Sequence, residues 1–299
     1  MPERVLVTGA TGFIGRHIPA LLQARGYETH ITARSDLPQT AGITAHRVDL
    51  LRGDDAQRLI RDIRPDIIIH TAWYVAHGRF WTAPENTDWL EASTALAAYA
   101  AEAGARRFVG LGTCAEYATE AGDDAYPWPE TRPIAPATPY GEAKAALARR
   151  LAEMAEGRAR FGFAWARLFH LFGPGENPAR LVPSIMLALR EGREAPCASG
   201  RPVRDFISTQ NAAAAITALA TSDVTGPVNI ASGAPISIAA MARLIAQIVG
   251  RPDLLRLGAL PDRPNEPPYM VAHTGRLRRE VGFTAPVSLA AELRDLQMR

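Results

Sequence analysis

The sequence predicts an α/β protein built on a doubly wound parallel sheet. Two observations indicate this fold: short apolar runs alternate with helical patterns, and a glycine-rich turn directly follows the first apolar run. Such alternation is typical of a parallel sheet that helices cover on both faces. The chain has 299 residues, of which 47% are hydrophobic, so it is long enough to bury a full core.

The strands and helices are expected in alternating order along the chain. The expected strands cover residues 4–8, 28–33, 43–48, 66–70, 107–112 and 163–168. The expected helices cover residues 13–25, 54–63, 88–103 and 139–156. After Gly173, prolines interrupt the alternating pattern. Over residues 204–220 the pattern resembles that of the main sheet again, so we expect the chain to return to that sheet there. We therefore predict a Rossmann-type dinucleotide-binding domain (1–172 and 204–230) and a smaller discontinuous substrate-binding lobe (173–203 and 231–299).

The turn after the first strand is spaced for a dinucleotide pyrophosphate. Gly9 suits a tight turn, Gly12 leaves the backbone open to phosphate, and Gly15 lets the next helix lie close to the strand. The N-terminus of that helix would face the anion with free N–H groups. Thr11, Phe13 and Ile14 complete the expected cofactor-binding turn.

The end of the second strand bears on the choice of cofactor. NAD-binding folds place a carboxylate there for the ribose hydroxyls, whereas arginine suits a 2′-phosphate. Ala33 occupies the expected acidic position and Arg34 follows it. This favours NADP, with NAD as the alternative because Asp36 is close by.

A tyrosine and a lysine share one face of a later helix. Tyr140 and Lys144 lie four residues apart, and Pro139 begins the helix. A nearby cation favours the phenolate form, so Lys144 is expected to lower the pKa of Tyr140 and make it a usable acid/base. Thr113 follows an apolar strand and would lie where open α/β sheets bind ligands.

Together these motifs resemble the extended short-chain dehydrogenase/reductase family, in its nucleotide-sugar branch. Residues 167–175 and 204–206 are similar to two further family segments. The resemblance implies an NAD(P)-dependent oxidoreductase with the catalytic residues Thr113, Tyr140 and Lys144. It implies cofactor contacts from Asp49, Leu50, Thr71, Ala72, Trp73, Tyr140 and Lys144. It implies substrate contacts from Thr113, Cys114, His170, Arg204 and Arg263, with Arg204 on the diphosphate; a structural ion pair with Asp205 is the alternative for Arg204.

The residues after Thr113 limit the reactions that the site could catalyse. The family's 4,6-dehydratases carry an Asp-Glu pair where this chain has Cys114 and Ala115, so elimination of water is unsupported. At a strand end Cys114 would point to the opposite face, which favours a packed small residue, with a catalytic thiol as the alternative; Glu116 is expected to be structural. The sequence predicts reduction of a nucleotide-linked keto sugar, such as a 4-keto-6-deoxyhexose. A 4-epimerase with retained NAD and a non-catalytic cofactor-binding sensor are the alternatives.

Aromatic residues gather between Trp73 and Trp81, after the strand that ends at His70. They are expected either to form a lid over the sugar or to pack as an ordinary loop. His77 in this segment is either an additional acid/base or, as is commoner for a lone histidine, structural.

Composition excludes several classes of protein. The net charge of +2 gives no basic surface for nucleic acid, and the two cysteines argue against a disulfide scaffold. No apolar run is long enough to span a bilayer, and a strand begins too early for a signal peptide. We expect a cytoplasmic enzyme without a metal ion or a membrane partner. The resemblance implies a homodimer through the two alanine-rich helices, and packing on the protein's own sheet is the alternative.

Overall fold

The computed structural model describes residues 2–35, 37, 40–119, 126–264, 266–285 and 288–298. Within them, seven parallel strands form the main sheet in the order β10-β6-β5-β4-β1-β2-β3. These strands are β1 (Arg4–Thr8), β2 (Glu28–Ala33), β3 (Ile43–Arg47), β4 (Ile67–His70), β5 (Arg107–Thr113), β6 (Gly162–Leu168) and β10 (Gly226–Ile230). The predicted doubly wound sheet is confirmed.

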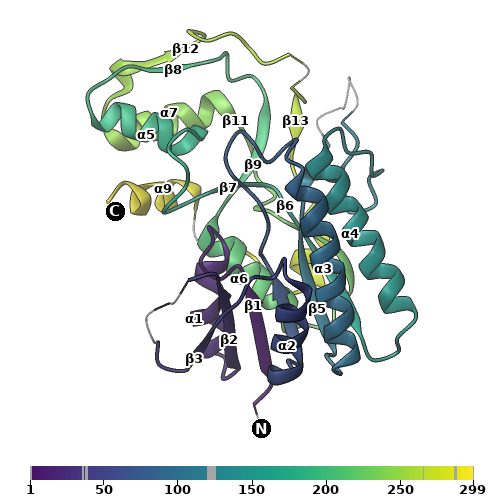
Figure 1. Ribbon diagram of the computed structural model, residues 1–299. Helices are drawn as coiled ribbons and strands as arrows, with labels where there is room; N and C mark the ends of the chain where they lie inside the picture. The colour runs from purple at the N-terminus through teal and green to yellow at the C-terminus, as the bar shows by residue number, and fades with distance from the viewer. Residues whose placement is uncertain are drawn as a thin grey trace.

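Helices cover both faces of the main sheet (Figure 1). One face carries α1 (Ile18–Gln23), α6 (Thr209–Ala220) and α8 (Gly275–Arg279), and the other carries α2 (Gly53–Ile63), α3 (Glu85–Glu102) and α4 (Pro139–Glu156). Successive residues of β1 point to opposite faces of the sheet. Val5 and Val7 pack in the core beneath α1 and α6, and Leu6 packs in the core beneath α2, α3 and α4. Burial on both faces explains why β1 and β4 are nearly continuous apolar runs.

The strand order reverses between β1 and β4, and such a switch point leaves a crevice at the carboxyl ends of the strands. The two strand ends are joined where Thr71 N donates to Thr8 O at 3.1 Å. The next strand, β5, ends at Thr113. The fold therefore brings the glycine turn after β1 and Thr113 to the same edge of the sheet.

A second, four-stranded sheet lies beyond this edge (Figure 1). It consists of β7 (His170–Phe172), β9 (Val203–Ser208), β11 (Pro235–Ser237) and β13 (Tyr269–Met270). Its neighbours are the helices α5 (Leu181–Arg190), α7 (Ile238–Val249) and α9 (Leu289–Gln297), and the strand pair β8 (Ala195–Cys197) and β12 (Leu255–Leu257).

Residues 204–220 were expected to return to the main sheet. This prediction is wrong for the strand in this segment, β9, and confirmed for the helix, α6. β9 pairs with β7, β11 and β13, whereas α6 packs on the main sheet. The second sheet thus joins β7 and β9, from the predicted dinucleotide-binding domain, to strands of the predicted lobe. The division of the chain into these two parts stays a prediction.

The first helix begins later than expected. Residues 15–17 form a 3-10 turn, and α1 begins only at Ile18. Pro19 has no N–H to donate to a preceding carbonyl, which suits it to the first turn of a helix and not to the interior of one that starts at residue 13.

The alanine-rich helices α3 and α4 lie side by side along one face of the main sheet (Figure 1). Leu96, Ala97 and Ala100 of α3 and Leu147 and Leu151 of α4 are buried in the core beneath them. This face therefore packs on the protein's own sheet, while the homodimer stays a prediction. No helix in the described ranges is long and apolar enough to cross a membrane.

Candidate active site

The glycine turn has the shape that a pyrophosphate site requires. Gly9 has φ of +70°, and a Cβ there would lie 2.6 Å from Ala72 N. A Cβ on Gly15 would collide with Gly9 O and with Thr71 Oγ1. Thr11 and Gly12, between them, are exposed. Backbone therefore packs on backbone beneath the turn and is open to a ligand above it, which fits a bound dinucleotide.

Further residues predicted for the cofactor surround this turn. Thr71 Oγ1 donates to Thr8 O at 2.6 Å, and Arg16 Nε donates to Gly12 O at 3.0 Å. The Arg16 guanidinium thus places a positive charge beside the turn, as an anion would require. Phe13 and Ile14 are half-buried behind the turn.

The adenosine end of the predicted site lies at the ends of β2 and β3. Arg34 directly follows β2 and is exposed. Asp49 follows β3, and its Oδ1 accepts from Leu51 N at 3.2 Å, while Leu50 is buried in the core. Asp36, on which the NAD alternative depends, lies outside the described residues.

The structure brings the three predicted catalytic side chains together at the end of β5. Thr113 ends this strand, and Tyr140 and Lys144 lie in the first turns of α4, where Thr138 Oγ1 caps the helix by accepting from Gly141 N. Lys144 Nζ donates to Leu111 O at 2.9 Å and lies 3.7 Å from the centre of the Trp73 ring. The same Nζ lies 6.0 Å from the centre of the Tyr140 ring.

The expected lowering of the Tyr140 pKa by Lys144 is not what this structure shows. Burial raises the pKa of Tyr140 well above its ordinary value, the charges of Glu116 and Cys114 add to the rise, and a hydrogen bond with Thr113 and the charge of Arg180 oppose it. Burial also lowers the pKa of Lys144 to about 7, against an opposing effect of Glu116. Desolvation is the largest effect on the pKa of both groups, because both leave water. Tyr140 is therefore a neutral phenol at neutral pH.

Lys144 is the single lysine of the chain. Because its side chain is buried, we expect this candidate catalytic residue to lower the free energy of unfolding. The unfolded chain keeps this proton up to the ordinary pKa of 10.5, whereas the folded protein releases it near 7. Between these values the unfolded state binds more protons, so the free energy of unfolding rises with pH. Lys144→Met removes the buried charge, and we expect it to raise the free energy of unfolding at pH about 7 by about 0.5–2 kcal/mol.

Urea unfolding of both proteins at pH about 7 and about 9 checks this expectation. The gain from Lys144→Met should shrink at the higher pH, because wild type then folds with a neutral amine. A variant that is less stable than wild type at the lower pH would contradict it.

The aromatic segment after β4 packs directly against Tyr140. The rings of Phe80 and Trp81 meet the Tyr140 ring edge-on, at centroid distances of 4.9 and 5.7 Å, and Tyr140 N donates to Trp81 O. Trp73 Nε1 donates to Asn86 Oδ1 at 2.9 Å. His77 is exposed on the turn between them. The segment therefore holds the phenol ring, and its action as a lid stays a prediction.

The expected orientation of Cys114 assumed that this residue lies at the end of a strand. In the structure Cys114 does not lie on a strand. It begins a 3-10 turn, Cys114–Glu116, that Thr113 caps by accepting from Ala115 N at 3.2 Å. The thiol is buried with Tyr117, Trp128 and Phe169, and burial raises its pKa to about 12. Cys114 is thus a packed, neutral thiol, and the charge of the nearby Arg204 opposes the rise in its pKa.

Two arginines and a histidine of the second sheet and its neighbours lie close to the cluster formed by Thr113, Cys114 and Tyr140. Arg204 is buried, and its Nη2 donates to Glu266 Oε1 at 2.8 Å; Asp205 accepts instead from Ser232 and Gly233. Burial lowers the pKa of His170 to about 3, and the charges of Arg204 and Arg180 add to this effect. Within the described chain, His170 Nδ1 is buried without a hydrogen-bond partner. The neutral ring can therefore accept from or donate to a ligand.

Two charged residues beside this cluster escaped the sequence interpretation. Arg180 is the N-cap of α5, and its charge affects Tyr140 and His170. A cation opposes the helix dipole there and caps poorly, which is a signal that could have drawn attention to it. Glu176 is half-buried, and burial raises its pKa to about 7. Arg263, in contrast, is exposed on the segment before β13, and its contact with substrate stays a prediction.

Comparisons with known proteins agree with this geometry. Residues 5–231 match the family described as the NAD dependent epimerase/dehydratase family. A dTDP-6-deoxy-L-talose 4-dehydrogenase (NAD(P)(+)) of Kitasatospora kifunensis is 28% identical, covering 99% of this chain and 95% of the relative. A dTDP-glucose 4,6-dehydratase of Streptomyces griseus is 26% identical, covering 97% of this chain and 92% of the relative. The structure of a UDP-glucose 4-epimerase of Thermotoga maritima superposes with a TM-score of 0.86 at 20% identity, covering 99% of this chain and 98% of that one.

The chain belongs to the NAD dependent epimerase/dehydratase family, within the nucleotide-sugar branch of the extended short-chain dehydrogenases/reductases. The resemblance seen in the sequence is thereby confirmed. At these identities the relatives fix the kind of enzyme and leave its particular reaction to the site itself.

Proposed function

We propose that this protein reduces the keto group of a nucleotide-linked 4-keto-6-deoxyhexose with a nicotinamide cofactor. The observation that carries the proposal is the assembly of Thr113, Tyr140 and Lys144 at the end of β5, beside the glycine turn. The NAD(P)-linked 4-dehydrogenase among the relatives supports the proposal, because its name describes hydride transfer at C4 of a nucleotide-linked 6-deoxy sugar.

The protonation states of the site suit reduction. When bound, the nicotinamide cofactor supplies the hydride to the carbonyl carbon. Tyr140 is the neutral phenol and donates its proton to the carbonyl oxygen, which completes the alcohol. Thr113 donates a hydrogen bond to the same oxygen and holds it against Tyr140. Lys144, as an ammonium, stabilises the tyrosinate that is left.

Elimination of water would need groups that this turn does not offer. Ala115 has no proton to transfer, and the buried Cys114 thiol stays protonated because its pKa is about 12. This supports a reaction that stops after hydride and proton transfer.

The cations beyond Tyr140 would hold the diphosphate of the substrate. Arg204 and Arg180 both lie close enough to lower the pKa of the neutral His170. A guanidinium matches phosphate oxygens with a planar set of donors and keeps its charge at all relevant pH values. The sugar would then reach from these cations to Tyr140.

NADP is the proposed cofactor, because Arg34 rather than an acid follows β2. Arg34→Ala should weaken NADPH binding by about 1.5–3 kcal/mol and leave NADH binding nearly unchanged, since only the first carries a 2′-phosphate. Calorimetry with both cofactors measures the difference, and Arg25→Ala removes an exposed charge elsewhere as a control. Equal losses for both cofactors would make NAD the better assignment.

Thermal protection by nucleotide sugars, followed by cofactor consumption, tests the proposed function. A ligand present at about a hundred times its dissociation constant adds about 2.7 kcal/mol to stability. The protecting keto sugar should then oxidise added NADPH one for one. Interconversion of two nucleotide sugars without net cofactor oxidation would instead establish the 4-epimerase. Binding without any turnover would establish the cofactor-binding sensor.

A further inference from the structure

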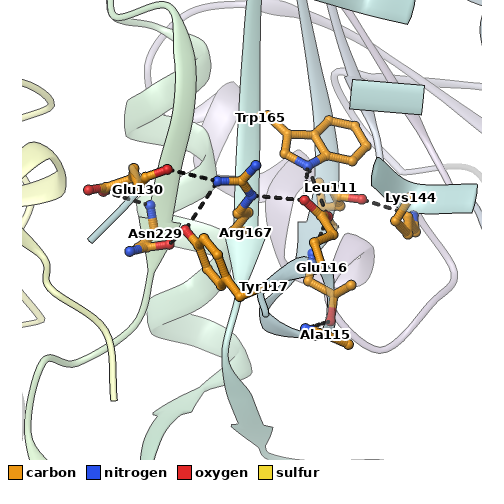
Figure 2. Close-up of polar contacts among 10 residues, drawn as sticks. Leu111, Ala115, Glu116, Tyr117, Glu130, Lys144, Trp165, Arg167 and Asn229 are labelled. Carbon is orange, nitrogen blue, oxygen red and sulfur yellow. Dashed lines mark hydrogen bonds and ion pairs between the residues drawn. The ribbon is translucent and has the colours of Figure 1, made fainter. Parts of the chain in front are cut away.

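A carboxylate is buried directly behind the proposed catalytic threonine. Glu116 is 0% exposed and ends the turn that Thr113 begins. Its Oε1 accepts from Thr113 N at 2.8 Å and from Trp165 Nε1 at 3.0 Å, and its Oε2 accepts from Arg167 Nε at 2.8 Å. Figure 2 shows the carboxylate between the Trp165 indole and the Arg167 guanidinium. Every donor around it points at the charge.

The sheet leaves space for this carboxylate. A Cβ on Gly112 would collide with Trp165 Nε1 and with Glu116 Oε1. Taking a carboxylate out of water costs several kcal/mol unless a counter-charge and hydrogen bonds offset it. A neutral side chain could cap this turn without that cost. Here the Arg167 guanidinium supplies the counter-charge, and Thr113 N and Trp165 Nε1 supply the hydrogen bonds.

Arg167 ties the carboxylate to the rest of the molecule. Its Nη1 donates to Tyr117 Oη and to Glu130 O, both at 3.2 Å (Figure 2). Tyr117 Oη in turn donates to Asn229 Oδ1 of β10 at 2.7 Å. The turn that carries Thr113 is thus fixed to β6 and β10 through one buried network.

The charge also lies close to the proton-bearing groups of the site, since Glu116 accepts from Thr113 N while Lys144 Nζ donates to Leu111 O, two residues earlier on β5. Burial raises the pKa of Tyr140 and lowers that of Lys144, and Glu116 raises both. Its effect on Lys144 opposes desolvation and favours the ammonium. The pKa of Glu116 itself is raised by burial, while Arg167 opposes the rise and favours the carboxylate.

We propose that Glu116 is a positioning residue, which holds Thr113 in place through its backbone N–H and keeps a paired negative charge beside Tyr140 and Lys144. The proposal rests on the proposed function for the roles of Thr113 and Tyr140. It assigns to Glu116 no contact with substrate or cofactor.

The single lysine gives a test that needs no turnover. Lysine labelled with ¹³C at Cε yields one side-chain NMR signal, and its shift against pH reports the protonation of Lys144. In Glu116→Gln the titration midpoint should fall by at least about half a pH unit, because a negative charge is lost. Tyr117→Phe cuts the same network without removing the charge, and its midpoint should match wild type.

Kinetics provides the second measurement. Glu116→Gln should lower kcat by about ten- to a hundredfold with KM within about threefold, since Thr113 is held less well. Tyr117→Phe should keep kcat within about twofold. If Glu116→Gln fails to fold, Glu116→Gln combined with Arg167→Met removes both charges together and is expected to show a smaller fall in the midpoint, because the opposing charge of Arg167 is lost as well.

An unchanged Lys144 titration in a folded Glu116 variant would overturn the proposal and leave Glu116 as a structural residue. The NMR result is independent of the reaction. If wild type reduced no keto sugar but the midpoint still fell, the proposed function would fail while the electrostatic role of Glu116 held.

Discussion

Tyr140→Phe is expected to lower turnover by about a hundred- to ten-thousandfold, because it removes the group that donates the proton. Its structural effect should be small. Phe80 and Trp81 pack edge-on against the ring, and phenylalanine keeps this packing. Steady-state oxidation of the reduced cofactor with the protecting keto sugar measures the loss.

Two controls belong to this experiment. Cofactor affinity, measured by titration without substrate, should stay within about threefold of wild type. Tyr99→Phe removes a hydroxyl from α3, outside the site, and should keep full turnover. If Tyr140→Phe retained turnover within a few-fold of wild type, Tyr140 would not be the acid/base.

Arg204→Met is expected to cost about 2–3 kcal/mol of nucleotide-sugar binding, because it deletes a charge-assisted contact to phosphate. The same change leaves Glu266, whose side chain is 26% exposed, without its partner. Some loss of folding stability should therefore accompany the loss of binding. Calorimetry with the nucleotide sugar and urea unfolding measure the two effects separately.

Glu266→Gln separates the two roles of Arg204. It breaks the ion pair and keeps the guanidinium, so nucleotide-sugar binding should remain within about threefold of wild type. If Glu266→Gln lowered binding as much as Arg204→Met, or if Arg204→Met bound normally but unfolded more easily, the ion pair would be purely structural.

Local patterns predicted the main sheet well where its strands are buried on both faces, as β1, β4 and β5 are. The predicted strands at residues 4–8 and 28–33 coincide with β1 and β2, and β5 and β6 each extend one residue further than predicted. The start of the first helix was wrong because the pattern extended it through Pro19. The placement of β9 was wrong because its burial resembles that of a main-sheet strand, while its neighbours β7, β11 and β13 come from elsewhere in the chain.

The candidate site was predictable where its residues lie at strand ends or share one helix face. Gly9, Thr113, Tyr140 and Lys144 belong to this group. The pKa of Tyr140 was not predictable, because spacing shows the lysine and not the desolvation that outweighs it. The ion pair of Glu116 and Arg167 joins residues 51 positions apart, and only the packing of β5 against β6 brings them together.

The central claim is net reduction of a nucleotide-linked keto sugar, and the fate of a labelled hydride tests it most directly. Reduced cofactor that carries deuterium at the transferred position is incubated with the protein and a nucleotide-linked 4-keto-6-deoxyhexose. We expect one deuterium at C4 of the product sugar for each cofactor oxidised, and none with Tyr140→Phe. Nucleotide sugars that interconvert without taking up deuterium, or a label that stays wholly in the cofactor, would contradict it.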